Sequence, residues 1–375
     1  MSSSVLRLAP WIGALCLLAP ESGADNISRT DGTTIEDITI DEETLTEVSY
    51  RDGNRERTVP TEEVLSILYT NKPNQIDEAD SYYAEGSYLD ALDVYDAYVD
   101  GFLEGRNQRR HKWAPAYAAW QAVQVNLSLG DLAGVVSAST RIVERLPDSR
   151  FVPQAFLMRA NALAWQGKSD DAQESLQAFS ALIESRGLST RWDLECRLSL
   201  VLTDSSLRGS RRRDALDALE GEAGRNYPTV ANRCRVAVGE SWLEGIEQER
   251  DAGTRASNIG NAQEVFEEIL QDFKADEQTL AGAFAGMGDC LFLTAMVDQE
   301  NPDAAGLQSA LHHYLRVSVL YPEEIRYVPR AIYSAGLCFD MMEDYGRAGK
   351  LWRRVMRDFP GSEYATLAEQ RLRGG

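Results

Sequence analysis

The sequence has few of the residues from which active sites and metal sites are usually built. Among 375 residues there are three histidines, His111 in a charged stretch and the adjacent pair His312 and His313. Neighbouring residues on a helix point to different faces, so this pair cannot readily share one metal ion. No HExxH, P-loop, GxSxG or CxxC motif occurs. We therefore expect no enzyme, no metal site and no cofactor.

Positive charge is also scarce. The chain has 38 Lys and Arg against 59 Asp and Glu, which gives a net charge of −21. Nucleic acids and anionic lipid surfaces are polyanions, so neither is expected as the main partner. Two basic clusters, 106–112 and 208–213, interrupt the acidic background. We expect them to pair with the protein's own carboxylates, with docking of an anionic partner as the alternative.

No apolar run reaches the roughly 20 residues that a membrane-spanning helix needs. A short run from Leu8 to Ala19 follows Arg7 and precedes the small residues Ser22-Gly23-Ala24. This pattern is typical of a signal peptide, here residues 1–24 with cleavage after Ala24. Lipid anchoring through Cys16 is not favoured, because Leu15 before it fits the lipoprotein motif poorly. The mature chain is predicted to be exported to a periplasm or outside the cell, without a membrane-spanning segment.

Cysteines are few as well. An even number remains after the signal peptide, which permits disulfides in an oxidising compartment: Cys196, Cys234, Cys290 and Cys338. Each falls in the first helix of a predicted helix pair, and equivalent positions in stacked pairs lie about 10 Å apart. A disulfide needs Cα atoms within about 7 Å. Buried free thiols are therefore favoured.

Residues 25–70 form a separate segment before the helices, and as far as about residue 63 it has the character of β-strands. Short runs contain β-favouring and other apolar residues: Ile35, Ile38, Ile40, Leu45, Val48, Tyr50 and Val59. We predict a small β module, a three-stranded meander closed by a short helix at 62–69. Because so few strands are marginally stable alone, the module should pack on the first helix pair as a cap or complete a small barrel. It loosely resembles the SH3-like modules that precede repeats in some exported bacterial proteins, so ligand binding by the module is an alternative.

Most of the sequence, residues 74–372, consists of an internal repeat. The clearest copy, 329–360, reads as two amphipathic helices joined by a tight turn. Gly336 and Ala348 allow the two helices to approach closely, and Trp352 fills the gap above them.

Six further copies share this spacing. We use the small residue in the second helix of each copy as its marker. The markers are Ala91, Val135, Ala172, Ala215, Ala262, Ala310 and Ala348. A bulkier apolar residue follows four positions later in most copies: Tyr95, Leu176, Leu219, Phe266, Tyr314 and Trp352, with Ser139 as the exception. The markers are 37 residues apart between Val135 and Ala172 but 48 apart between Ala262 and Ala310. Inserted linkers at 105–112, 205–213, 251–260 and 298–307 are expected to account for the excess.

The pattern resembles the tetratricopeptide repeat (TPR), a helix-turn-helix of about 34 residues. Gly336, Phe339, Ala348, Trp352 and Pro360 stand at that family's spacings. The resemblance implies an all-α fold, a TPR-like α-solenoid of about seven repeats over 74–372 that follows the β module. A C-terminal helix at 364–372 is expected to cap it. In repeat style the chain resembles periplasmic TPR proteins, namely the outer-membrane-assembly lipoproteins and the Tol-associated division coordinators.

TPR proteins usually bind an extended peptide in a concave groove lined by the first helix of each pair. Carried over by position, the candidates are Tyr117, Trp120, Gln124, Asn161, Trp165, Arg233, Arg330 and Tyr333. The aromatic members could instead pack between repeats.

The expected function is an exported, non-catalytic scaffold that binds a protein or peptide partner in a cell-envelope complex. The alternative is a structural or cell-wall-associated protein in which the β module binds and the repeats act as a spacer. The sequence leaves the oligomeric state open.

Overall fold

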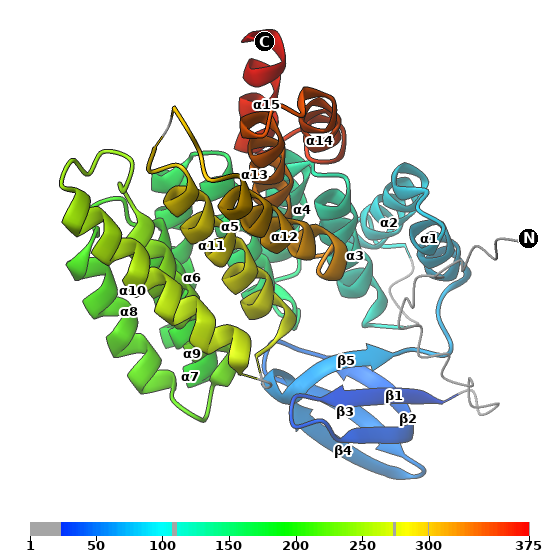
Figure 1. The fold of residues 1–375 in the computed structure, drawn as a ribbon. Helices are drawn as coiled ribbons and strands as arrows, with labels where there is room; N and C mark the ends of the chain where they lie inside the picture. The colour runs from blue at the N-terminus through cyan, green and yellow to red at the C-terminus, as the bar shows by residue number, and fades with distance from the viewer. Residues whose placement is uncertain (1–23, 107–110, 273–274, 299, 375) are drawn as a thin grey trace, which may run out of the picture.

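The computed structural model describes residues 24–106, 111–272, 275–298 and 300–374. Residues 1–23 of the predicted signal peptide, and 107–110 of the first basic cluster, lie outside these ranges. Within them the chain forms a five-stranded antiparallel sheet followed by fifteen α-helices (Figure 1). None of the described helices is both long and apolar enough to cross a membrane.

The β module has two more strands than the sequence predicts. The strands are β1 (Asp25–Arg29), β2 (Thr34–Glu43), β3 (Glu47–Asp52), β4 (Arg55–Pro60) and β5 (Val64–Leu68), in the order β4-β3-β2-β1-β5.

The prediction of a short helix at 62–69 is wrong. One 3-10 turn over Thr61–Glu63 leads into β5, which pairs antiparallel with β1. Local sequence at 62–69 suits a helix, but pairing with β1 gives this segment backbone partners and buries Val64 and Ile67.

The helices pack as consecutive pairs, from α1/α2 to α13/α14, with α15 after the last pair. Their bounds are α1 (Asn74–Ala84), α2 (Tyr88–Leu103), α3 (Ala114–Ser128), α4 (Leu132–Arg145), α5 (Val152–Trp165), α6 (Ser169–Arg186), α7 (Thr190–Thr203), α8 (Ser210–Ala223), α9 (Pro228–Leu243), α10 (Ala252–Gln271), α11 (Glu277–Ala295), α12 (Ala304–Leu320), α13 (Val328–Met341), α14 (Tyr345–Asp358) and α15 (Glu363–Gly374). The predicted TPR-like solenoid is confirmed. The predicted capping helix is α15, which buries Ala365 and Ala368.

The marker residues occupy equivalent places in six of the seven proposed repeats. The markers of these six are fully buried: Ala91, Val135, Ala172, Ala262, Ala310 and Ala348. The assignment in the fourth pair is wrong, because Ala215 is partly exposed while Leu216, Leu219 and Ala223 are buried. In α6 the marker Ala172 is followed by buried residues at Leu176, Phe179 and Ile183. The buried residues of α8 stand at the same distances from Arg212, so Arg212 occupies the marker position of the fourth pair. Its long charged side chain cannot be buried there as alanine is. Its guanidinium instead donates to Glu244 and to the carbonyl of Asp204.

The prediction of a linker at 251–260 is also wrong. Residues 252–260 belong to α10, a helix of 20 residues. Asp251 caps its start by accepting a hydrogen bond from the backbone N–H of Thr254, 2.7 Å away. The extra length of the fifth copy therefore lies in a longer helix.

The small and bulky positions fit each other as predicted. A Cβ atom added to Gly336 would overlap the ring of Trp352, and one added to Gly288 would lie 2.6 Å from the ring of Tyr314. The indole N–H of Trp352 donates to the carbonyl of Tyr333 at 3.2 Å. The helices of these pairs can approach this closely only where the facing residue is glycine.

The four described cysteines are buried free thiols, as predicted. They lie on the first helices α7, α9, α11 and α13, at Cys196, Cys234, Cys290 and Cys338. Burial raises the pKa of each thiol to about 12. They are therefore neutral packing groups at physiological pH.

The sequence predicts that the β module packs on the first helix pair, but its ring and ion-pair contacts to the helices are made at later pairs. The module lies against the N-terminal ends of α3, α5 and α7, which belong to the second, third and fourth pairs (Figure 1). Tyr69 stacks on Trp113 with ring centroids 3.7 Å apart, Glu43 pairs with Arg150, and Arg191 donates to a backbone carbonyl of the module. One hydrophobic core runs from the sheet into these helices, so the module and the first half of the solenoid share their core.

The solenoid also closes on itself. Gly130, in the turn between α3 and α4, has a φ of 67° and lies against the end of α14. A Cβ atom there would be 3.0 Å from Cα of Phe359 and 3.1 Å from Cδ of Pro360. The second helix pair therefore touches the junction between the seventh pair and α15.

Candidate binding site

A cavity of about 570 Å³ lies on the inner face of the C-terminal half. Its walls come from α9, α11 and α13, the first helices of three successive pairs, and from the connection that follows α9. Tyr364 of α15 closes one side. We call this space the inner cavity.

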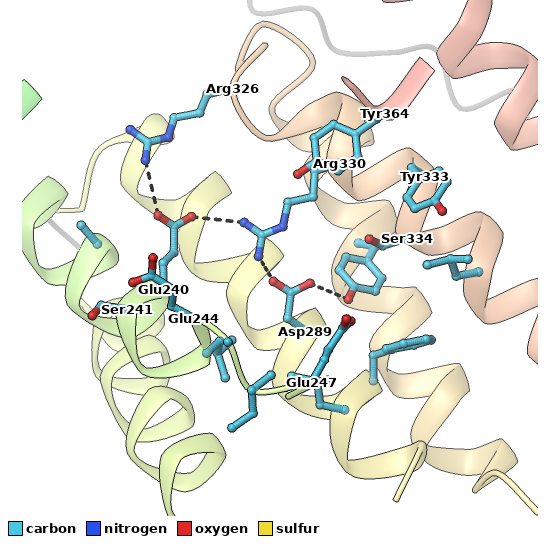
Figure 2. Close-up of a pocket in the computed structure, with 18 of the residues that line it drawn as sticks. Glu240, Ser241, Glu244, Glu247, Asp289, Arg326, Arg330, Tyr333, Ser334 and Tyr364 are labelled. Carbon is cyan, nitrogen blue, oxygen red and sulfur yellow. Dashed lines mark hydrogen bonds and ion pairs between the residues drawn. The ribbon is translucent and has the colours of Figure 1, made fainter. Parts of the chain in front are cut away.

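An ion-pair network joins the walls of the inner cavity (Figure 2). The two carboxylate oxygens of Glu240 on α9 accept from Arg326 at 3.3 Å and from Arg330 at 3.2 Å. Arg330 also pairs with Asp289 on α11, which accepts a hydrogen bond from the hydroxyl of Tyr314 at 2.7 Å. These groups are mostly shielded from water, so their positions are fixed by several partners at once.

Helical spacing explains how α9 and α13 present these groups. Glu240 lies seven residues after Arg233, and residues seven apart share one face of a helix. Arg330 stands in the first turn of α13, next to Pro329, which begins the helix without needing a backbone donor. Arg326 lies in the loop that leads into the same helix.

The rim of the inner cavity adds further polar and aromatic groups. Glu244 pairs with Arg212 at 3.3 Å, and Glu247 lies in the connection between α9 and α10. The rings of Tyr333 and Tyr364 are tilted by 44° to each other, with their centroids 5.9 Å apart. Burial raises the pKa of Tyr364 to about 12, so its hydroxyl stays neutral.

Of the predicted groove residues, Arg330 and Tyr333 line the inner cavity. Arg233 lies on α9 but pairs with Glu195 of α7 instead. Trp165 lines a separate small cavity of about 50 Å³ at the contact that closes the solenoid, beside Ile325.

The remaining candidates are in the N-terminal half and do not join this site. The hydroxyl of Tyr117 donates to the carboxylate of Asp80 at 3.1 Å. Trp120 stacks on Phe151, with ring centroids 5.5 Å apart. Gln124 and Asn161 are half-buried on α3 and α5. The structure thus places Tyr117 and Trp120 in the packing contacts that the sequence left open as their alternative.

The sequence reasoning missed Glu240, Asp289, Arg326 and Tyr364. Glu240 could have been found from its spacing to Arg233. No local signal indicates Arg326 or Tyr364, because a loop and the last helix bring them to the cavity.

The described residues offer no obvious metal centre. Among them, no group of three or more His, Cys, Asp or Glu could hold a metal ion. The ring of His313 is half-buried and lies 5.8 Å from the ring of Phe284. Burial is the main cause that lowers its pKa.

Comparisons with known proteins give only distant likenesses. No family model and no curated protein matches the chain. The apo form of the quorum sensor NprR from B. thuringiensis is 13% identical, covers 79% of this chain and 78% of its own, and has a TM-score of 0.38. The P58(IPK) TPR domain is 16% identical over 79% of this chain and 88% of its own, with a TM-score of 0.26. Yeast Tom70 is 17% identical over 76% of this chain and 62% of its own, with a TM-score of 0.22.

The chain's own helix pairs, buried marker residues and close glycine contacts identify its fold. On those grounds the chain is a TPR-like helical-repeat protein with an N-terminal β module.

Proposed function

We propose that this protein is an exported, non-catalytic scaffold that binds a segment of a protein partner in the inner cavity, as part of a cell-envelope complex. The main support is the network of Glu240, Arg326, Arg330 and Asp289 in a cavity of about 570 Å³. Sites for ligands commonly have volumes of about 300–1,000 Å³. A wall that is already ordered loses little conformational entropy when a partner binds.

The chemistry of the inner cavity suits recognition better than catalysis. Arginine and tyrosine, the residue types of binding hot spots, line it together with Phe292 and Leu337. The carboxylates of Glu240 and Asp289 are engaged by arginines, so neither is free to act as a general base.

Export is supported by the signal-peptide pattern of residues 1–24, and cleavage after Ala24 is compatible with the contacts of β1. Strand β1 begins at Asp25, whose carboxylate accepts hydrogen bonds from the backbone of Ile40 and Thr70, each at 3.0 Å. Cleavage after Ala24 would leave these contacts in place. N-terminal sequencing of the protein recovered from its host should give Asp25 as the first residue. An uncleaved chain in the cytoplasm would contradict export.

A second candidate function assigns binding to the β module, with the repeats as a spacer. One observation favours it: Leu65 on the edge strand β5 is 69% exposed beside a cleft of about 360 Å³. The core that the module shares with α3, α5 and α7 means that its deletion would also disturb the helices. Deletion is therefore a poor test, and point variants are needed.

Replacement of Arg330 by alanine tests the proposed function. The partner is first identified by co-purification with the mature chain. Its affinity should fall about tenfold or more in Arg330→Ala, because a hot-spot arginine is lost. Arg347→Ala, on the exposed surface of α14, is the control and should bind as the wild type does. Unchanged affinity in an Arg330→Ala protein with native circular dichroism would contradict the proposal.

A further inference from the structure

The charged side chains that line the inner cavity do not balance one another. Three are basic and four are acidic: Arg212, Arg326 and Arg330 against Glu240, Glu244, Glu247 and Asp289. At neutral pH the lining therefore has one more negative charge than positive. A bound segment that covers the cavity must supply the missing positive charge or leave a carboxylate uncompensated.

The carboxylate without a partner is that of Glu247. Arg326 and Arg330 are held by the network, and Arg212 pairs with Glu244. Among the described residues, no lysine or arginine forms an ion pair with Glu247. In Figure 2, Glu247 lies on the same side of the cavity as Asp289.

The local backbone holds Glu247 at this position. Gly245, with a φ of 73°, makes a turn in which its carbonyl accepts from the backbone N–H of Gln248 at 3.0 Å. The neighbouring Ile246 is buried, 4% exposed, and anchors the turn. Glu247 itself stays exposed at the cavity.

The surroundings of Glu247 suit a long basic side chain. Phe292, Leu293 and Leu337 line the same cavity and offer apolar surface to the methylene groups of lysine or arginine. An acidic side chain finds no comparable place, because it would have to displace Glu240 or Asp289 from the arginines that hold them.

We propose that the inner cavity takes a lysine or arginine side chain of the bound segment and that Glu247 is the carboxylate that recognises it. The proposal rests on the proposed function, since it names the chemistry of the partner segment at that same site. The recognised group is a primary ammonium or a guanidinium on an aliphatic stem.

A peptide selection tests this subsite. The probes are pools of N-acetylated, C-amidated dodecapeptides, random except for a fixed Lys, Arg, Gln or Glu at one central position. Wild-type protein should retain the Lys and Arg pools roughly fivefold over the Glu pool, the scale of one exposed ion pair. Glu247→Gln should abolish this preference, and Glu247→Lys should reverse it. Glu264→Gln, which changes an exposed carboxylate on α10, should keep it.

The outcomes separate the two proposals. Equal retention of all pools by the wild type, or an unchanged preference in Glu247→Gln, would overturn the basic subsite and leave peptide binding in place. Failure of folded wild-type protein to retain any pool would count against the proposed function and the subsite together. Because Glu247 is exposed, its variants should melt as the wild type does, which circular dichroism checks.

Discussion

Replacement of Arg150 by alanine is expected to lower the free energy of unfolding by about 3–5 kcal/mol, because it leaves a buried carboxylate without its counter-charge. The side chain of Glu43 is 0% exposed and that of Arg150 is 7% exposed. Glu43 also accepts a hydrogen bond from the hydroxyl of Tyr69. In Arg150→Ala this hydroxyl cannot replace the lost positive charge. Urea denaturation followed by circular dichroism measures the change.

Two further variants make this prediction specific. Arg197→Ala removes an exposed pair with Glu222, whose side chains are 41% and 45% exposed, and should cost less than about 1 kcal/mol. Adding Glu43→Gln to Arg150→Ala should recover part of the stability, because the buried group is then neutral. A cost in Arg150→Ala as small as that in Arg197→Ala would show that the β module is not fixed to the helices by this pair.

Replacement of Gly130 by valine is expected to open the solenoid. The φ of 67° alone should cost about 1–2 kcal/mol for a residue with a side chain. The new side chain would also meet the backbone at Phe359 and Pro360, where a Cβ atom already lies 3.0 and 3.1 Å away. We expect a total loss of roughly 2–5 kcal/mol, the strain plus the usual cost of overpacking, and a larger radius of gyration in small-angle scattering.

The turn of the third helix pair offers a matched control. Gly167 lies between α5 and α6 with a φ of 76°, and a Cβ atom there would have no atom within 4 Å. Gly167→Val should therefore show the backbone strain without the expansion. Equal radii of gyration in Gly130→Val and Gly167→Val would mean that the contact at Gly130 does not hold the solenoid closed.

The parts of the fold that could be predicted from sequence are those set by local spacing. Ala348 and Trp352 are four residues apart on one helix, so their roles can be recognised without knowing what lies beyond the helix pair. Strand β5 could not be predicted in this way, because its partner β1 is more than 30 residues earlier in the chain. Ala215 was misassigned because small residues are frequent in α8 and only packing selects among them.

The residues of the candidate site also differ in whether local spacing or long-range packing places them. Arg330 and Tyr333 were found because they lie on the face that a first helix turns inward. Trp120 lies on an equivalent helix, but Phe151 covers its ring, which the sequence gives no means of foreseeing. Tyr364 reaches the inner cavity from α15, and Arg326 from a loop, so both depend on how the last repeat is placed.

The proposed binding of a partner segment in the inner cavity is tested most directly by hydrogen exchange of the protein with and without its partner. Slower exchange is expected in the connections at 244–248 and 322–327, which border the cavity. No change is expected in the exchange of β5 (Val64–Leu68). Protection confined to β5 and the turn before it, with the two connections unaffected, would contradict the account and favour binding by the β module.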